Sequence, residues 1–398
     1  MIKSLHEVYV VARDLFQGRY PAFVYGRGLA DDEIPCFCFH GVEPEPFEQM
    51  LAYLRDNDYH TLSIDDFAEV LTGTRPRPHP RSVLLTFDDG TASMWGVAYP
   101  LLCKYEMRGT VFLVPGRIRH RTARRPNLAD VWAGRASLEA VCGYDHGDEP
   151  FATWEEIAEM HASGCMDFES HSLDHSLVFV SPRIVDFVRP ALLKQFHLFE
   201  FPRIRTGPEA VEDIDRLGMP LYETRPRLAG IPRYRDDPEV RRRCVAHVQD
   251  HGGEAFFERP TWRRELKAVV HACRERGLQD GYESLEECRE AIRFDLEQSR
   301  RLIDEHLPGK HTRHLCYPWG VGSALAVELA REMGYRTGFW DGPDAGRTAR
   351  IGQDPHQIPR IGPDFFYTLP GVGSQRLQQV ILKKIRGRLR QPTPYLTH

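Results

Sequence analysis

The stretch that decides the fold is Ser82-Val83-Leu84-Leu85-Thr86-Phe87-Asp88-Asp89-Gly90. Its first part is an apolar run with the length of a buried strand, and the run stops at two adjacent carboxylates and a glycine. Asp-Asp-Gly after a strand often forms only a turn, because Asp and Gly accept the backbone angles that turns need. A pair of carboxylates is also suited to acid–base chemistry. The stretch alone leaves both interpretations open.

A second polar motif follows downstream, His171-Ser172-Leu173-Asp174-His175. A lone His-x-x-x-His pair often has no ligand role. Two neutral histidines and one aspartate, with a position left for water, nevertheless form a suitable ligand set for a divalent metal. The other aspartate of the Asp88-Asp89 pair could then take a proton from the water. Together the two motifs predict a metal-assisted hydrolase.

Strand-like and helix-like stretches alternate along much of the chain. Apolar runs predict strands at 35–39, 82–87, 109–114, 166–170, 314–317 and 336–340. Helical spacing and capping signals predict helices at 47–55, 97–105, 154–162, 285–307 and 324–333. Thr153 with Glu156 forms a capping box at the third of these helices. Repeated strand–helix units of this kind favour a parallel sheet.

A third motif makes the chain resemble a known family. Cys316-Tyr317-Pro318-Trp319-Gly320 is similar to the family pattern Arg-x-Pro-aromatic-Gly, and Phe39-His40-Gly41 is similar to its opening Tyr-His-Gly. The motifs at 86–90 and 171–175 are intact forms of Thr-Phe-Asp-Asp-Gly and His-Ser-x-x-His. In this order they resemble the polysaccharide deacetylase family (NodB homology, carbohydrate esterase family 4), over roughly residues 35–175 and 283–365.

The resemblance implies a fold and a set of roles. The fold would be α/β, a distorted (β/α)7-type barrel with a mostly helical insertion. Asp89, His171 and His175 would be the metal ligands, and Asp88 would be the general base. Zn²⁺ is the first expectation, although Ni²⁺, Co²⁺ or Fe²⁺ would suit the same ligands. These residues fall at the C-terminal ends of predicted strands, where barrel enzymes place their chemistry.

The third motif departs from the family pattern at one position. Trp319, which follows Pro318, would supply the backbone N–H that completes the oxyanion hole of the family. The family arginine that orients the catalytic aspartate is replaced here by Cys316. The late Leu-x-His motif that supplies the general acid is not evident. His40 is therefore a candidate acid, and His356 lies in the right region of the sequence but in a different context.

The chain divides into three parts. Residues 1–176 and 281–370 would form the barrel. Residues 177–280 exceed what the family core needs and predict an inserted helical subdomain, either a lid or a peripheral or oligomerisation element. Residues 371–398 form a basic amphipathic tail, which could lie on an anionic membrane surface or pack on the barrel with a solvated basic face.

Composition and charge exclude some classes of protein. The chain has 398 residues, and its net charge of −5 argues against a nucleic-acid-binding protein. No apolar stretch has the length needed to span a bilayer, and the N-terminus shows no secretory signal. These features predict a cytoplasmic protein, with the basic tail as a peripheral contact at the inner membrane face. The nine cysteines are expected to be buried, reduced thiols.

The expected function is hydrolysis of the N-acetyl group of an N-acetylated sugar. The missing signal and the basic tail favour a lipid-linked or nucleotide-linked glycan precursor as the substrate. Arginines in the long connection 115–149 would suit a phosphate-bearing substrate, although such arginines are often only solvated. The alternatives are an amidohydrolase acting on a small non-sugar amide or cyclic imide, and an inactive carbohydrate-binding protein.

Overall fold

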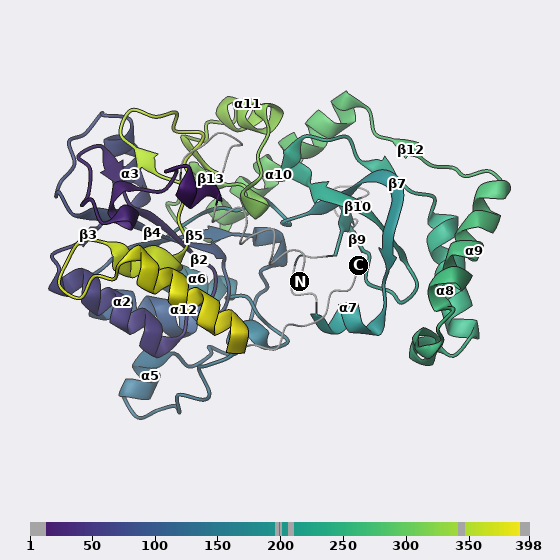
Figure 1. Cartoon of the computed structure of the whole chain (residues 1–398), viewed down its shortest axis with the longest axis horizontal. Helices are drawn as coiled ribbons and strands as arrows, with labels where there is room; N and C mark the ends of the chain where they lie inside the picture. Colours follow the sequence, from purple (N-terminus) through teal and green to yellow (C-terminus); the bar gives the residue numbers. More distant parts are fainter. Residues whose placement is uncertain (1–12, 196–198, 200, 206–210, 341–346, 391–398) are drawn as a thin grey trace. The chain divides into compact units, whose positions relative to one another are not determined.

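The computed structural model describes residues 13–390, except 196–198, 200, 206–210 and 341–346. Figure 1 follows the helices and strands along the chain. The chain forms two compact units. Unit 1 comprises Met1–Leu173, Leu296–Gly320 and Ala330–His398, and unit 2 comprises Asp174–Asp295 and Val321–Leu329.

Unit 1 is built on a parallel sheet with the strand order β14-β13-β6-β5-β4-β2, and β3 pairs with the start of β4. The strands are β2 (Cys36–Phe39), β3 (His60–Thr61), β4 (Ser82–Asp89), β5 (Gly109–Leu113), β6 (Met166–Ser170), β13 (His314–Cys316) and β14 (Thr337–Phe339). β4 is buried along its whole length, as expected of a parallel strand that is covered on both faces. A separate antiparallel pair joins β1 (Glu33–Ile34) to β15 (Ala349–Arg350).

A short extended segment, residues 358–361, joins the two edges of this sheet. Ile358 forms a parallel bridge with Phe339 of β14, and Ile361 forms one with Phe37 of β2. Backbone hydrogen bonds of 2.9 to 3.1 Å complete both links. The sheet therefore curls into a distorted (β/α) barrel, which confirms the predicted fold class.

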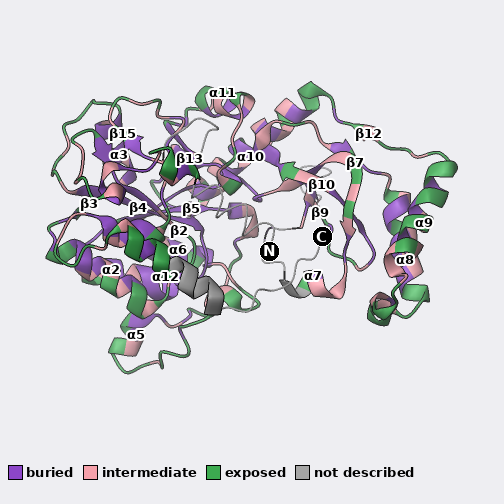
Figure 2. Cartoon of the chain, viewed as in Figure 1, coloured by how far each residue is buried: buried purple, intermediate pink, exposed green. Residues whose placement is uncertain are grey.

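The helices of the barrel and its connections are α2 (Pro44–Asp56), α3 (Ile64–Leu71), α4 (Tyr99–Lys104), α5 (Leu128–Trp132), α6 (Trp154–Ala162), α10 (Leu285–His306), α11 (Ala324–Glu332) and α12 (Leu377–Arg390). They include the five that the sequence predicts, α2, α4, α6, α10 and α11, whereas α3 and α5 were not predicted. The helix predicted at 97–105 is preceded by a π-helical turn at Met94–Ala98. Figure 2 shows the strands of the sheet as mostly buried, with exposed residues on the outer faces of the helices.

The start of α6 is fixed by a buried carboxylate with two partners. The Glu156 carboxylate accepts a hydrogen bond from the Thr153 N–H (3.0 Å), and the Thr153 hydroxyl accepts one from the Glu156 N–H (3.4 Å), which is the predicted capping box. The same carboxylate accepts from Arg125 Nε (2.9 Å), and both charged side chains are buried. Because β6 follows α6 in the chain, this pair helps to place the residues at the end of β6.

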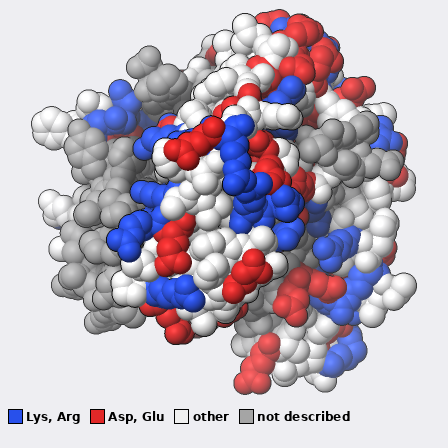
Figure 3. Space-filling view, turned by 90° about the vertical axis from the view of Figure 1, so that its right-hand side faces the viewer, with Lys and Arg blue, Asp and Glu red and all other residues white. Residues whose placement is uncertain are grey.

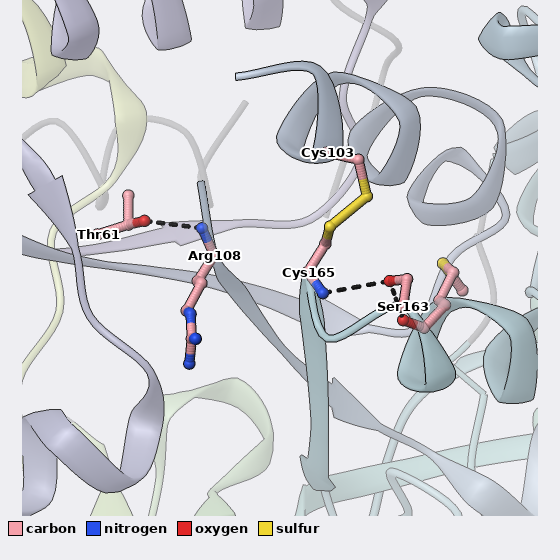
Figure 4. The surroundings of a disulfide bond; sticks show 6 residues. Thr61, Cys103, Arg108, Ser163 and Cys165 are labelled. Carbon is pink, nitrogen blue, oxygen red and sulfur yellow. Dashed lines mark hydrogen bonds between the residues drawn. A yellow bond between two sulfur atoms is a disulfide. The ribbon is translucent and has the colours of Figure 1, made fainter. Parts of the chain in front are cut away.

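A disulfide joins Cys103, in the last turn of α4, to Cys165, just before β6 (Figure 4). The sequence predicted reduced thiols, so this pair differs from the expectation. The two cysteines are 62 residues apart and carry no pairing signal. They meet because β5 and β6 are neighbours, and the Gly109 N–H donates to the Cys165 carbonyl (3.0 Å). The other seven cysteines are free thiols.

Unit 2 contains strands as well as helices. β7 (Leu177–Phe187) pairs antiparallel with β10 (Pro220–Pro226), and two smaller pairs join β8 (Arg203–Arg205) to β9 (Val211–Asp213) and β11 (Tyr234–Arg235) to β12 (Gly281–Tyr282). Its helices are α7 (Pro190–Gln195), α8 (Pro238–Asp250) and α9 (Trp262–Glu275). α8 and α9 agree with the helical subdomain predicted for residues 177–280, whereas the strand pairs were not predicted.

Charged side chains are mixed on the surface. Figure 3 shows basic and acidic side chains interspersed over one face of the molecule. Arg242 and Glu239 of α8, for example, form an exposed ion pair of 2.6 Å. This mixing differs from the single-sign surface of a typical nucleic-acid-binding protein.

α12 forms the first part of the predicted basic tail. Leu377 and Val380 pack against the core of unit 1, whereas Ile381 and Leu382 are exposed. The side chains of residues 384–390 and all of 391–398 lie outside the described part of the chain. Among the residues that are described, no helix has both the length and the apolar character to cross a membrane. Contact of the tail with a membrane surface stays a prediction.

We expect Glu156→Gln to destabilise unit 1 by about 3–5 kcal/mol, because it leaves the buried Arg125 guanidinium without its counter-charge. Glu155→Gln is the matched control, since this neighbouring side chain is half exposed. It should cost about 1 kcal/mol or less. Urea unfolding followed by circular dichroism measures both. Equal losses of unfolding free energy in the two variants would show that the ion pair of Arg125 with Glu156 does not stabilise the start of α6.

Candidate active site

Asp88 and Asp89 are the last two residues of β4, and both are buried. Asp89 and Gly90 each have a φ of 73°, so the chain turns sharply as the strand ends. Aspartate is one of the few residue types that tolerate this left-handed backbone. A Cβ at Gly90 would lie 2.7 Å from a methyl carbon of Leu113, so the second turn position needs glycine. The turn therefore holds two adjacent carboxylates at the C-terminal end of a buried strand.

Asp88 is held by an arginine that the sequence did not indicate. Arg360 Nη1 donates to Asp88 Oδ1 and Nη2 donates to Asp88 Oδ2, each at 2.6 Å. The same guanidinium contacts the Thr86 hydroxyl (2.9 Å) and Cys316 Sγ (2.9 Å). Two parallel N–H bonds fix the plane of the carboxylate as well as its charge. The arginine that is missing at position 316 is thus replaced in space by Arg360.

The two carboxylates have opposite electrostatic surroundings. Burial alone would raise the pKa of Asp88, but the Arg360 guanidinium outweighs burial and holds this pKa well below its usual range. Burial and then the negative charge of Asp88 raise the pKa of Asp89 to about 8. Asp88 is therefore ionised at neutral pH, and a cation beside Asp89 would favour its ionised form as well.

His171 follows β6 and has a fixed orientation. Its Nδ1 donates to the backbone carbonyl of Cys316 at 2.8 Å. Because a carbonyl can only accept, Nδ1 carries the proton and Nε2 keeps its lone pair. Nε2 lies 3.6 Å from Asp89 Oδ1 and 3.9 Å from Asp88 Oδ2. Burial lowers the pKa of His171 to about 4, so the ring is neutral at pH 7.

Asp89 and His171 are spaced like two ligands of one cation. Ligand atoms that lie about 2.1 Å from a tetrahedral zinc ion are about 3.4 Å from each other, close to the 3.6 Å found here. His175 is the third predicted ligand, and it belongs to the start of unit 2. It is buried, and its ring stacks on Phe199 with the centroids 4.1 Å apart. A carboxylate and neutral imidazoles fit a zinc-type ion.

His40 lies next to Asp88, whereas His356 does not join this group. His40 follows β2 and is exposed. A ring nitrogen of His40, Cys38 Sγ and a carboxylate oxygen of Asp88 lie within 4.8 Å of one another. His356 is buried, and its backbone N–H donates to Asp354 (2.9 Å). His40 therefore has the better position for a general acid, and its role stays a prediction.

Pro318 and Trp319 follow β13 in a 3-10 turn, Pro318–Gly320. Pro318 is buried, whereas the Trp319 side chain is 39% exposed. Trp319 has a φ of 61°, which is uncommon for a bulky residue and typical of strained functional turns. The Cys316 carbonyl just before this turn accepts the bond from His171. The third motif is thereby fixed to the second, while the oxyanion role of Trp319 stays a prediction.

A small pocket of 130 Å³ lies beside the turn that follows Asp89. Its lining comprises Arg117, Arg119, His120, Arg121, Asp148, Glu149, Pro150, Phe151, Ala152 and Thr153. The wall joins the active-site turn, because the Ala152 N–H donates to the Gly90 carbonyl (3.0 Å). Arg121 pairs with Glu149. Arg119 is exposed and forms no ion pair with any residue that the structure describes.

Part of the chain is similar to known polysaccharide deacetylases. Residues 75–216 match the family model described as polysaccharide deacetylase. The poly-beta-1,6-N-acetyl-D-glucosamine N-deacetylase of Escherichia coli (strain K12) is 24% identical over 194 residues, which is 48% of this chain and 27% of that protein. The protein of the same name from Staphylococcus aureus (strain MSSA476) is 26% identical over 140 residues, 35% of this chain and 39% of that protein. The matches thus span less than half of either relative.

A solved structure supports the fold. The deacetylase domain of BpsB from Bordetella bronchiseptica superimposes with a TM-score of 0.50 and 19% identity, covering 84% of this chain and 96% of that domain. At this identity the likeness shows the fold alone. The family match includes the motifs at 86–90 and 171–175. Residues 75–216, which carry both motifs, are therefore similar to the polysaccharide deacetylase family, the resemblance that these motifs predicted.

Proposed function

We propose that this protein is a metal-dependent N-deacetylase that hydrolyses the N-acetyl amide of an N-acetylated sugar. The observation that carries the proposal is the clamped Asp88 carboxylate, 3.9 Å from His171 Nε2. The ionised carboxylate of Asp88 and the neutral, unprotonated Nε2 of His171 therefore lie close together at the C-terminal ends of the barrel strands. The names of the two curated relatives describe removal of N-acetyl groups from a glucosamine polymer.

The proposed metal ligands are Asp89, His171 and His175. One carboxylate and two neutral imidazoles suit Zn²⁺, and Ni²⁺, Co²⁺ or Fe²⁺ would accept the same donors. When bound, the ion would polarise the amide carbonyl and make the attacking water more acidic. The Cys316 carbonyl contributes by holding His171 in the tautomer that leaves Nε2 available.

The remaining residues would move protons and stabilise charge. Asp88 takes the proton of the attacking water, and Arg360 keeps that carboxylate ionised and oriented. His40, at the exposed rim beside Asp88, is the proposed donor of a proton to the leaving amine. The backbone N–H of Trp319 is the proposed donor to the developing oxyanion.

We further propose that the acetylated sugar is a precursor carried on a phosphate, either lipid-linked or nucleotide-linked. The pocket around Arg119 supports an anionic group close to the reacting amide, because its wall is bonded to the turn after Asp89. Arginine is well suited to phosphate, since its planar fork donates two hydrogen bonds to neighbouring oxygens.

We expect Asp88→Asn to keep its metal and to lose acetate release by about 10²–10⁴-fold, because an amide cannot take the proton from water. Elemental analysis of the purified variant and an acetate assay on N-acetylglucosamine-containing precursors measure the two properties. Asp354→Asn is the control, since this carboxylate is half exposed and pairs with Arg331 outside the site. Full activity of Asp88→Asn would show that Asp88 is not the general base. Full activity of wild-type protein without bound metal would show that the reaction does not need the ion.

We expect Arg360→Gln to move the acid limb of the kcat/KM profile to higher pH. Without the guanidinium, burial raises the pKa of Asp88, so less of the carboxylate is ionised at a given acid pH. Arg360→Lys keeps a charge but not the bidentate geometry, so its shift should be smaller. Kinetics across the acid and neutral range, with metal content checked, measure the shift.

The control and a rescue variant separate this effect from misfolding. Arg331→Gln, at an exposed pair with Asp354, should leave the profile unchanged. The double variant Cys316→Arg/Arg360→Cys moves the guanidinium to the family position. It should shift the acid limb of the kcat/KM profile part of the way back to its wild-type pH. If Arg360→Gln leaves the acid limb of the kcat/KM profile at its wild-type pH, Asp88 is not the group whose protonation causes that limb.

A further inference from the structure

A second group of potential ligands lies at the opposite end of β4 from the candidate active site. Asp58 follows α2, His60 opens β3 and His79 precedes β4. His60 pairs with Ser82, the first residue of β4, so the group sits where the strands begin. Ligand atoms of Asp58, His60 and His79 all lie within 4.8 Å of one another.

Both imidazoles point Nε2 at the same carboxylate. His60 Nε2 lies 3.4 Å from Asp58 Oδ1, and His79 Nε2 lies 3.3 Å from Asp58 Oδ2. The His60 contact is a long hydrogen bond, and both separations are longer than the commonest N–H···O range of about 2.7–3.2 Å. They match the spacing of about 3.4 Å between two ligands that each lie about 2.1 Å from a tetrahedral metal ion. The geometry therefore suits coordination of a metal ion as well as long hydrogen bonds to Asp58.

The two rings also lie close together, with His60 exposed and His79 partly exposed. Their centroids are 4.1 Å apart, with 42° between the ring planes. Two protonated rings at this distance would repel, whereas two neutral rings can share a cation. The side chains of Asp58 and His60 are 76% and 56% exposed. An ion could therefore enter from solvent and keep water in its remaining positions.

We propose that Asp58, His60 and His79 form a second metal site, separate from the candidate active site, for a divalent transition metal of the zinc or nickel class. Two imidazoles and one carboxylate suit these ions, whereas Mg²⁺ and Ca²⁺ prefer oxygen ligands. Binding has a cost at His79, whose Nδ1 accepts a hydrogen bond from the Arg81 N–H (3.2 Å). For Nε2 to coordinate, the proton must move to Nδ1 and that bond must break.

The site would connect three segments of unit 1, namely the turn after α2, the start of β3 and the connection before β4. A metal that binds only the folded protein raises its stability by mass action. The readouts are therefore bound metal and thermal stability, and neither needs catalysis.

The test is a zinc count in a protein whose proposed catalytic ligands are removed. The background variant Asp89→Asn/His171→Gln should bind one equivalent of Zn²⁺ in equilibrium dialysis, and further replacement of His60 and His79 by Asn should abolish binding. Wild type should bind two equivalents, and His60→Asn/His79→Asn alone should bind one. His311→Asn is the matched control, an exposed histidine of unit 1, and should change neither count.

The pattern of counts separates this proposal from the proposed catalytic metal. If only the second site exists, wild type binds one equivalent that depends on His60 and His79. If only the catalytic site exists, the single equivalent is lost with His171→Gln. Zinc should also raise the Tm of the background variant, but not after His60 and His79 are replaced. No zinc on the background variant, or binding that survives loss of both histidines, would overturn the proposal.

Discussion

The closure of the barrel by residues 358–361 is the constraint on which the candidate site depends. The segment bonds to β14 on one side and to β2 on the other, and Arg360 lies between those two attachments. Its guanidinium then reaches Asp88 at the end of β4. Either charge buried alone would cost several kcal/mol, so neither is stable there without the other. The same contact thus completes the sheet and sets the charge of the proposed base.

This arrangement explains how the third motif can lack its arginine. A guanidinium at position 316 would meet Arg360 at the same carboxylate, and two cations would compete for one anion. The smaller thiol of Cys316 instead lies 2.9 Å from Arg360 Nη2. The backbone at Cys316 keeps a separate task, because its carbonyl fixes the tautomer of His171. Side chain and backbone at one position therefore serve two different residues of the site.

The sequence predicted the barrel better than it predicted the site. Buried apolar runs such as β4 and the capping box of α6 are local signals, and the structure has both where they were expected. Arg360 gave no such signal, because its partner is 272 residues away and the closing segment is too short to show a strand period. In unit 2 the pairing of β7 with β10 shifts register twice, which breaks the alternation that identifies strands.

The bond between Cys103 and Cys165 relates the fold to the compartment in which the protein works. Disulfides persist in oxidising surroundings such as the periplasm and are rare in the cytosol, where glutathione and thioredoxin keep thiols reduced. A cytosolic enzyme would carry two thiols at this place, and the covalent link from α4 to the start of β6 would be gone. β6 leads directly to His171. The redox poise of the compartment is thereby coupled to the strand that presents a proposed metal ligand.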